Sequence, residues 1–550
     1  MMGTEADVAA ELPPDEASRL AVLRARLAAP LPNDRPWGWL GPLLVTAFGG
    51  WLRFNRLQVP NALIFDETYY AKDAWSILQH GVEWNYISPA NNPNLANQLI
   101  ITGHTTGLFA PCSGTSCGEY VVQPEVGKEL IAVGEWLFGL NSFGWRFSSA
   151  VFGTLAILLV CRIARRMTRS TLLGCVAGLL MSLDGLEFVL SRTGILDIFL
   201  MFFILAAFGC MVIDRDVSRA RLAEAVARLG ASGSSGSGPR LGLRKWQVAC
   251  GILLGLAVGT KWIAAWYIVA FVCLGIAWDI GARRAAGLRY YVKGAFRDAV
   301  WMPLTFIVIP LVVYIATWSN WLLTSTGYDR NYAHQHGVNI PVISALYSLY
   351  EYHRAAIGFG LGLSQPHPYQ SQPWDWLLIT RPVAFFYESY SVPVAGAQHY
   401  CPASGCTGTW WSQEVLAIGT PLIWWSAILA LVFCLGWWLL HRDWRAGAVL
   451  LGVVAGWGPW WPLVTRTKFY YYALEFEPFL ILSIVLCLGL ILGPATASPR
   501  RRAIGAGIVG AYLLGALLMF WYFYPIMAGK VILYQDWLSH MWYRIGKGWI

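Results

Sequence analysis

Two adjacent carboxylates, Asp66 and Glu67, are the residues of this sequence best placed to do chemistry. They lie in Phe65-Asp66-Glu67-Thr68-Tyr69-Tyr70, shortly after the first apolar segment. A helix end near lipid headgroups favours Lys, Arg, Trp and Tyr, and acidic side chains gain little there. A carboxylate at the mouth of a helical bundle can accept a proton or hold a polar substrate. A solvated turn, or an N-cap for a helix over 69–78, explains the pair equally well, so both interpretations stay open.

The composition indicates a polytopic membrane protein. Of the 550 residues, 56% are hydrophobic and only 13% are charged, and the mean hydropathy is +0.48. Soluble domains carry about 25% charged residues. The net charge of +9 is therefore interpreted by side of the membrane. No basic soluble domain remains that could bind DNA or RNA, so we expect no nucleic-acid partner.

Because a span needs about 20 apolar residues, we predict roughly eleven transmembrane helices in an all-α protein. The basic clusters between them, such as 162–169 and 500–502, fall on one side of the membrane if the N-terminus is inside. The positive-inside rule then places the N-terminus in the cytoplasm and the C-terminus outside. The predicted spans are 38–56, 143–162, 171–189, 196–213, 246–260, 262–279, 301–322, 415–440, 446–463, 470–492 and 503–524.

The remaining segments complete the predicted organisation. Residues 1–36 are polar and of mixed charge, which predicts a cytoplasmic tail with one short helix from Pro14 to Leu27 and no cleavable signal peptide. Residues 37–550 form the membrane domain, with large outer loops at 57–142 and 323–414 whose aromatic and proline content indicates functional structure. Segment 214–245 contains a Gly/Ser run and is expected to be a flexible cytoplasmic loop. Residues 525–550 are expected to form an outer tail.

The eleven cysteines fall into two groups. Seven lie in or beside apolar spans and behave most simply as small hydrophobic residues. Cys112/Cys117 and Cys401/Cys406 have identical spacing in polar outer loops, which predicts two disulfides and an oxidising compartment. A zinc site with His399 is the alternative, but two cysteines per loop fall short of four ligands.

Further ionisable residues lie at the outer ends of the spans and in the outer loops. Charges at membrane depth usually face a cavity or a partner, so the outer face offers a pocket for an anionic lipid headgroup. A salt bridge between Arg192 and Asp197 that locks two helices is an equally good explanation of that pair. Lys261 could instead extend to the interface. The residues concerned are Arg146, Arg192, Asp197, Lys261, Arg466, Lys468, Lys128 and Arg381.

The second outer loop adds several histidines, of which His367 lies in Gln365-Pro366-His367-Pro368-Tyr369. Lone histidines are more often structural than catalytic. The sequence contains no P-loop, GxGxxG, HExxH or GxSxG motif, so nucleotide cofactors and hydrolase chemistry have no support.

Six segments carry a family resemblance through their residues and their order: 65–70, 122–128 with 134–139, 146–149 with 191–197, 255–262, 367–374 with 381–382, and 466–471. Together they resemble the bacterial, actinobacterial form of the protein O-mannosyltransferases, which are polyprenyl-phosphate-mannose-dependent enzymes of the GT-C class. Gln123 and Glu125 stand where this family usually has His and Pro, and Glu475 and Glu477 replace apolar or Pro residues. Residues 88–120 look like an insertion. The resemblance covers roughly residues 37–550.

The resemblance implies a GT-C fold and transfer of mannose, with inversion, from a polyprenyl phosphate to a Ser or Thr hydroxyl of an exported protein at the outer face of the plasma membrane. One carboxylate must activate the hydroxyl, and we expect this to be Asp66. The lipid phosphate is a weak base, so the reaction needs no general acid, unlike glycoside hydrolysis. Fixed positive charge must instead stabilise the leaving group. Arg146 is the first candidate for contacting the phosphate or ordering the site, before Lys261, Arg192 and Arg466; Glu67 would orient the acceptor or pair with a cation, and Asp197 would hold Arg192.

The resemblance implies no metal or other cofactor, although Asp66 and Glu67 could hold a divalent ion. The expected partners are membrane lipid, the lipid-linked donor and unfolded Ser/Thr/Pro-rich polypeptides, with the secretion machinery as a further candidate that no residue identifies. Lipid-linked arabinosyl or aminoarabinose transferases are the nearest alternative, since they share an early acidic motif. A secondary transporter is a more distant alternative. Transporters tend to have repeated halves and charges near the midplane of the membrane, whereas the polar residues here gather at the outer face.

Overall fold

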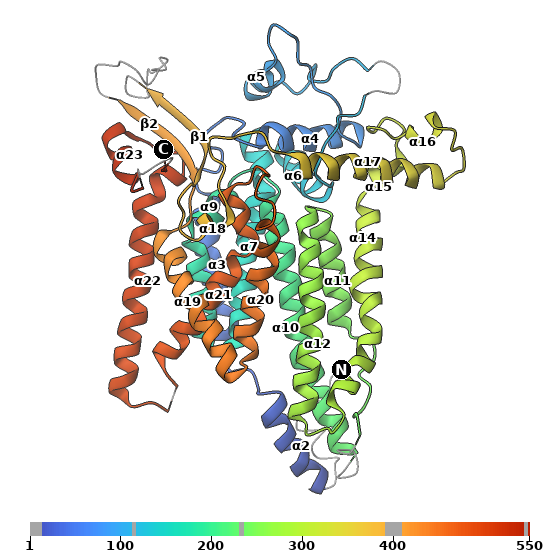
Figure 1. Ribbon diagram of the computed structural model, residues 1–550. Coiled ribbons are helices and arrows are strands. Elements are labelled where there is room, and N and C mark those ends of the chain that lie inside the picture. Colours follow the sequence, from blue (N-terminus) through green and yellow to red (C-terminus); the bar gives the residue numbers. More distant parts are fainter. Residues whose placement is uncertain are drawn as a thin grey trace.

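The computed structural model describes residues 14–112, 117–229, 236–390, 410–494, 496–543 and 548–549. It consists mainly of long, upright helices, with shorter elements gathered over one end of the bundle (Figure 1). This arrangement confirms the predicted helical membrane fold. Within the described residues, the first half of the bundle consists of α3 (Trp37–Phe54), α7 (Ser142–Thr168), α8 (Thr171–Ser182), α9 (Gly185–Leu190), α10 (Asp197–Arg228), α11 (Lys245–Val258), α12 (Ala265–Ala285), α13 (Tyr291–Asp298) and α14 (Ile309–Thr317).

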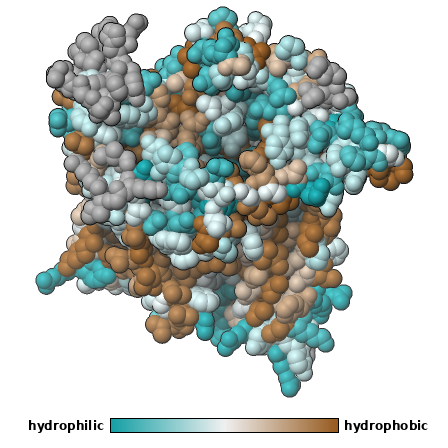
Figure 2. Space-filling model, turned by 45° about the horizontal axis from the view of Figure 1, so that its top comes forward, coloured by the Kyte–Doolittle hydropathy of each residue, from teal (hydrophilic) through white to brown (hydrophobic). Residues whose placement is uncertain are grey.

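The second half of the bundle lies beside the first and carries the C-terminal helices (Figure 1). On the face of the molecule shown in Figure 2, hydrophobic side chains gather around the middle of the bundle, whereas hydrophilic ones gather toward its two ends. This distribution is what a lipid-embedded bundle requires, because the lipid offers no partner for polar groups. The helices are α19 (Pro421–His441), α20 (Trp444–Trp457), α21 (Glu477–Leu492) and α22 (Pro499–Met527).

Each predicted span contains helix, but the count of eleven spans stays a prediction. Within the described residues, five helices are long and apolar enough to cross a membrane, and a sixth span results if the pair around Met302, bent by 42°, counts as one. Three further apolar helices, α8, α11 and α21, are shorter. The predicted span 171–189 is interrupted between α8 and α9, where Asp184 caps α9 by accepting hydrogen bonds from the Leu186 and Glu187 amides.

The short elements at the other end come from the two predicted outer loops and the C-terminal segment. They place α4 and α17 across the top of the bundle, above the upright helices (Figure 1). The predicted surface helix from Val126 is present as α6. The elements are α4 (Glu67–His80), α5 (Leu95–Ile101), α6 (Val126–Phe138), α15 (Ser319–Leu323), α16 (Tyr332–Gln335), α17 (Ile343–Gly362), α18 (Pro373–Trp376) and α23 (Tyr534–His540).

A small antiparallel sheet in this region was not predicted. It has the order β1–β2–β3, with β1 (Val383–Tyr390), β2 (Trp411–Ala417) and β3 (Val531–Leu533). In the register, Val383 faces Ala417 and Tyr390 faces Trp411. The predicted span 415–440 is therefore wrong at its start, because residues up to Ala417 belong to β2 and the helix begins at Pro421.

The first half of the segment predicted as a flexible loop at 214–245 is helical, which corrects that prediction. Helix α10 continues to Arg228, and its last turns pack against α2 (Pro14–Leu27), which matches the helix predicted in the N-terminal tail. The contact buries Leu222, Ala223 and Leu27. Ala, Leu and Arg favour helix, so a dense run of these residues after the span extends α10. The N-terminal helix α2 and the C-terminal helix α23 lie at opposite ends of the molecule (Figure 1).

Candidate active site

Glu67 lies at the centre of a closed ion pair. Arg146, on α7, donates from Nε and Nη2 to the two Glu67 carboxylate oxygens at 2.7 and 2.8 Å. Both side chains are fully buried. The Arg146 guanidinium also donates to the carbonyls of Leu57, Pro60 and Ala62. Arg146 therefore fixes the chain segment that leads to Asp66, and it orders the site rather than presenting its charge to a ligand.

The same carboxylate holds two backbone amides. Glu67 accepts hydrogen bonds from the Ile64 amide at 3.0 Å and the Gly194 amide at 2.8 Å. Gly194 comes just before α10, and a Cβ there would lie 3.0 Å from the Trp145 carbonyl oxygen. Glu67 thus joins the start of α4, helix α7 and the turn before α10 at one point. All acceptor positions of the Glu67 carboxylate face protein donors, which gives Glu67 a structural role beside Asp66.

Asp66 has a different environment, although it is the next residue in the chain. It is partly exposed, immediately precedes α4 and accepts a hydrogen bond from the Tyr471 hydroxyl at 3.3 Å. It is therefore a helix N-cap residue by position, but its side chain caps no amide. Burial raises the pKa of Asp66 to about 6, the Asp197 carboxylate adds to this rise, and the Lys261 ammonium opposes it. A carboxylate with this pKa can accept a proton near neutral pH.

Aromatic packing holds the backbone in front of Asp66. Phe65 has a φ of 47°, in the left-handed region that non-glycine residues rarely adopt. Its ring stacks on Phe385 of β1 at a centroid distance of 4.6 Å and meets the edges of Phe469 and Tyr471. Such strain costs on the order of 1–3 kcal/mol and persists where the surroundings over-determine the conformation. The sheet and the segment before α21 therefore help to orient Asp66.

Lys261 and Asp197 form the charged pair beside Asp66. Lys261 Nζ donates to both Asp197 carboxylate oxygens, at 2.9 and 2.8 Å. The expected Arg192–Asp197 salt bridge is wrong. Arg192 donates instead to the carbonyls at the end of α3, including those of Arg53 and Asn55, both at 2.7 Å. The turn between α9 and α10 directs the two side chains to different neighbours, so Arg192 caps α3.

A cavity of about 260 Å³ opens next to this pair. Lys261 and Arg466 both line it, and Arg466 is held by a hydrogen bond from Nε to the Gly360 carbonyl at 2.7 Å. Two cations on the wall of one cavity suit an anionic group. Gln123 and Glu475, two of the residues that depart from the family pattern, also line the cavity, with Trp262, Trp460 and Tyr472.

Lys128 lies in a separate buried cluster. Its ammonium pairs with Glu83 and, at 3.2 Å, with Glu125 at the start of α6. Burial acts to raise the pKa of both carboxyls. At Glu83 the Lys128 charge and the hydrogen bonds together outweigh burial, so the pKa of Glu83 is lowered, whereas burial and the Glu83 carboxylate hold the pKa of Glu125 well above its ordinary value. Lys128 is fully buried between them. The structure thus favours a role for Lys128 in joining α6 to the segment after α4.

The remaining predicted residues stabilise the second outer loop. His367 accepts a hydrogen bond from the Tyr369 amide at Nδ1 and packs its ring against Phe469. Arg381 donates to the Pro368 carbonyl at 3.1 Å. Both residues therefore support the aromatic cluster behind Phe65. Cys112 and Cys117 form the expected disulfide, while Cys401 and Cys406 lie outside the described residues.

The comparisons with known proteins show which family the chain belongs to. Residues 43–322 match the family of dolichyl-phosphate-mannose-protein mannosyltransferases, and residues 345–545 match the C-terminal four-helix region of protein O-mannosyltransferases. The chain belongs to the protein O-mannosyltransferase family. It is 38% identical to a polyprenol-phosphate-mannose–protein mannosyltransferase of Mycolicibacterium smegmatis, over 93% of each chain. A Corynebacterium glutamicum protein of the same name is 31% identical over 91% of each chain.

A solved structure supports the GT-C fold of this family member. The protein O-mannosyltransferase Pmt1-Pmt2 complex of Saccharomyces cerevisiae, bound to the sugar donor, has a TM-score of 0.68 to this chain at 14% identity. The match covers 97% of this chain and 94% of the yeast chain. At this identity the likeness concerns the fold.

Sequence reasoning assigned no site role to several residues that lie in or beside this candidate site. Tyr471, Tyr472 and Glu475 were placed inside a predicted span, 470–492, but they form a 3₁₀ turn, Tyr470–Glu475, before α21 begins at Glu477. Three consecutive tyrosines followed by acidic residues are a poor lipid-facing sequence, which was the available signal. No pattern in the sequence indicates that the Gly194 amide donates a hydrogen bond to Glu67.

Proposed function

We propose that this protein transfers mannose from polyprenyl-phosphate-mannose to Ser or Thr hydroxyls of exported proteins at the outer face of the plasma membrane. The observation that carries the proposal is the position of Asp66. It is a partly exposed carboxylate of raised pKa beside the Lys261–Asp197 pair, and Lys261 shares a cavity wall with Arg466. An acid–base group and a cationic pocket thus lie on one side of the site.

The reaction assigned to this arrangement is a single inverting displacement. The acceptor oxygen attacks the anomeric carbon, its proton passes to the Asp66 carboxylate, and the bond between that carbon and the phosphate oxygen breaks. The electron pair stays on the phosphate. Lys261 and Arg466 stabilise this charge, because preorganised cations in a site shielded from water act on charge that develops in the transition state. Glu67, paired with Arg146, holds Asp66 in place.

The proposed orientation places this site outside the cell. The basic clusters at 162–169 and 500–502 flank the junction of α7 with α8 and the start of α22. The positive-inside rule assigns such clusters to the cytoplasm. The elements around Asp66 then face outward, where exported, unfolded Ser/Thr/Pro-rich chains can enter. Docking to the secretion machinery would supply such chains.

Transfer is expected to be independent of added metal. Both oxygens of Glu67 accept hydrogen bonds from Arg146 and from backbone amides. Glu67 therefore has no oxygen available to bind a metal ion together with Asp66. Unchanged transfer after treatment with a chelator would support this proposal, and recovery only on addition of a divalent cation would overturn it.

The experiment that tests the function measures transfer of radiolabelled mannose from polyprenyl-phosphate-mannose to a Ser/Thr/Pro-rich peptide. Membranes would contain the wild type, Asp66→Ala or the control Asp536→Ala, which removes an exposed carboxylate from α23. Label is expected with the wild type and the control, and not with Asp66→Ala. Transfer by Asp66→Ala would remove Asp66 from the mechanism. Absence of label with every variant, where a known family member works, would point to another sugar, and pentose donors would be tested next.

A further inference from the structure

A second, larger cavity lies at the end of the bundle away from Asp66. Its volume is about 1160 Å³, and it lies between the junction of α7 with α8 and helices α19, α20, α21 and α22. Pockets for drug-sized ligands measure roughly 300–1,000 Å³, so this space exceeds that of a small polar metabolite. Helix α22 stands at the outside of the bundle, beside α19 (Figure 1).

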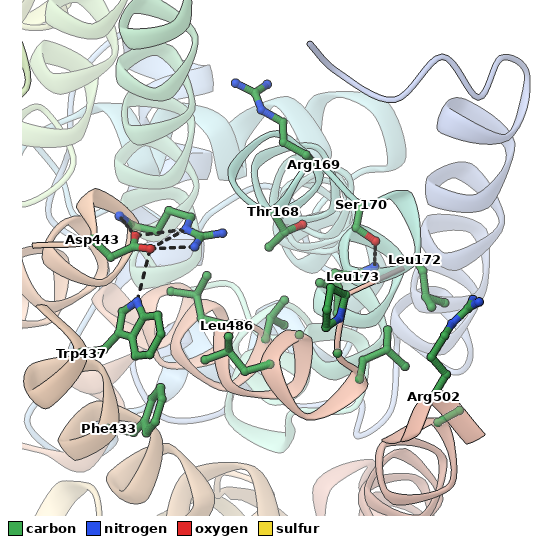
Figure 3. A pocket seen from close by; sticks show the side chains of 18 of the residues that line it. Thr168, Arg169, Ser170, Leu172, Leu173, Phe433, Trp437, Asp443, Leu486 and Arg502 are labelled. Carbon is green, nitrogen blue, oxygen red and sulfur yellow. Dashed lines mark hydrogen bonds and ion pairs between the residues drawn. The ribbon is translucent and has the colours of Figure 1, made fainter. Parts of the chain in front are cut away.

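The inner wall of this cavity is apolar. Leu173 of α8, Leu486 of α21 and Phe433 of α19 lie on it, and Figure 3 shows Leu486 and Leu173 between Asp443 on one side and Arg502 on the other. Gly489 and Ala506 add width, because they have small side chains where α21 and α22 face the space. Such a wall suits hydrocarbon chains and offers no partner for a free inorganic anion.

The rim of the cavity carries an excess of positive charge. Arg169, Arg445 and Arg502 line it, against one carboxylate, that of Asp443. Arg445 pairs with Asp443 at 2.7 Å, and Arg169 pairs with Asp216 at 2.9 Å. Arg502, on the opposite side of the cavity from Asp443, is exposed (Figure 3). Within the described residues, its guanidinium has no ion pair or hydrogen bond.

Three helices begin at this rim. The first turns of α8, α20 and α22 contribute Leu172, Arg445 and Arg502 to the lining. The partial positive charge at these helix starts is opposed by the ends of α7 and α21, which reach the same lining at Thr168 and Leu492, so the arginines decide the charge of the rim. At the start of α20 the Asp443 carboxylate already accepts from the Arg445 amide at 2.8 Å, whereas Arg502 remains available to an anion from outside the protein.

We infer that this cavity binds one anionic, two-chain phospholipid, with its phosphate beside Arg502 and its acyl chains between α8, α21 and α22. Basic pockets between transmembrane helices on the cytoplasmic side recognise anionic headgroups, and the apolar wall continues the lipid-facing side of the bundle. A polyprenyl phosphate has the same charge, but the cations proposed to receive it lie at the other end of the molecule. The site is thus a lipid-binding site separate from the transfer site.

Native mass spectrometry of the purified protein tests this inference. The wild type is exchanged into mixtures of phosphatidylglycerol, phosphatidylcholine and polyprenyl phosphate, and the retained lipid is identified. We expect one retained phosphatidylglycerol per chain. Arg502→Gln should lower this retention about five-fold, because an arginine near an anionic surface contributes on the order of 1 kcal/mol.

Arg500→Gln is the matched control, because it removes the same charge from the same turn of α22 but does not line the cavity. Its retention should equal that of the wild type. An equal loss in both variants, equal retention of phosphatidylcholine, or preferred retention of polyprenyl phosphate would each overturn the inference.

Filling the cavity gives an independent test. Ala506→Trp places a large ring in the space, whereas Gly507→Trp introduces the same ring at a neighbouring residue that has open space around it. Ala506→Trp should abolish phosphatidylglycerol retention, and Gly507→Trp should preserve it. Equal retention in both would contradict the proposed location. If Ala506→Trp fails to fold, the two arginine variants decide the question.

Discussion

Asp66 and Glu67 are neighbours in the chain, but they belong to two different regions of the site. Glu67 and Arg146 form a closed region, where each carboxylate oxygen and each guanidinium nitrogen has a protein partner. Asp66 belongs to an open region, with one weak hydrogen bond from Tyr471 and partial exposure. The closed region determines where the chain runs, and the open region keeps a carboxylate available for chemistry.

The difference separates positioning from reaction. Removing one partner of a buried ion pair leaves an uncompensated charge, which costs about 3–5 kcal/mol. Removing a general base costs rate, typically 10²–10⁴-fold, and little stability. A neutral substitution of Asp66 should therefore lower the rate of transfer and leave the stability nearly unchanged, whereas a neutral substitution of Glu67 should lower the stability.

Paired substitutions at these two residues should have the largest effects. Asp66→Asn should lower kcat about 10²–10⁴-fold and leave the Tm in detergent close to that of the wild type. Glu67→Gln should destabilise the protein by about 3–5 kcal/mol, because it leaves the Arg146 charge buried without a counter-charge. Mannosyl transfer and thermal unfolding are measured on the same preparations. A large loss of Tm in Asp66→Asn, or none in Glu67→Gln, would contradict the comparison.

The Lys128 cluster extends the comparison to a second closed region. Lys128→Met leaves Glu83 and Glu125 buried without a cation and should cost about 3–5 kcal/mol. Glu125→Gln should change the Tm less, because burial and the Glu83 charge disfavour the ionised form of Glu125 and raise its pKa, whereas the pKa of Glu83 is lowered. Thermal unfolding of both variants tests this order. Equal destabilisation by the two substitutions would show that Glu125 is ionised in the folded protein.

Sequence reasoning identified Asp66, Lys261 and Asp197 but assigned the wrong partner to Asp197. Arg192 is near in sequence and Lys261 is far, so sequence separation favoured the wrong pair. The choice depends on the turn between α9 and α10, which directs Arg192 to the end of α3. Tertiary geometry of this kind leaves no local pattern in the sequence.

The helical bundle was predictable because apolar length is a strong signal, whereas the sheet was not. The run Val383–Tyr390 does not alternate between apolar and polar residues. Its partner strand β2 lies at 411–417, and β2 pairs in turn with β3 at 531–533. Phe385 of this sheet supports Phe65, so one contact that orients Asp66 depends on a pairing between distant segments.

The pH dependence of transfer sharpens the assignment of Asp66. As a base it must be ionised, and its pKa is about 6, so kcat/KM should rise as the pH increases through about 6 and then level off. Lys261 lowers the pKa of Asp66, so Lys261→Met should move this rising part of the pH profile, its acid limb, to higher pH. Lys261→Arg should restore it, and Lys530→Met, at a cation that does not act on Asp66, should not move it. An unmoved limb in Lys261→Met would separate Asp66 from Lys261.

The Cys112–Cys117 disulfide provides the smallest expected effect and a baseline for the others. It closes a short loop in the predicted insertion at 88–120, and neither cysteine contributes to the Glu67–Arg146 pair or the Asp66 side. Short loops gain the least from a cross-link, on the order of 2 kcal/mol in the chain-entropy account. Cys112→Ser with Cys117→Ser should therefore lower the Tm less than Glu67→Gln and leave the pH limb near 6, measured by the same two assays. A shift of the acid limb of the pH profile would show that the insertion affects the pKa of Asp66. The open region around Asp66 would then extend beyond the residues that contact Asp66.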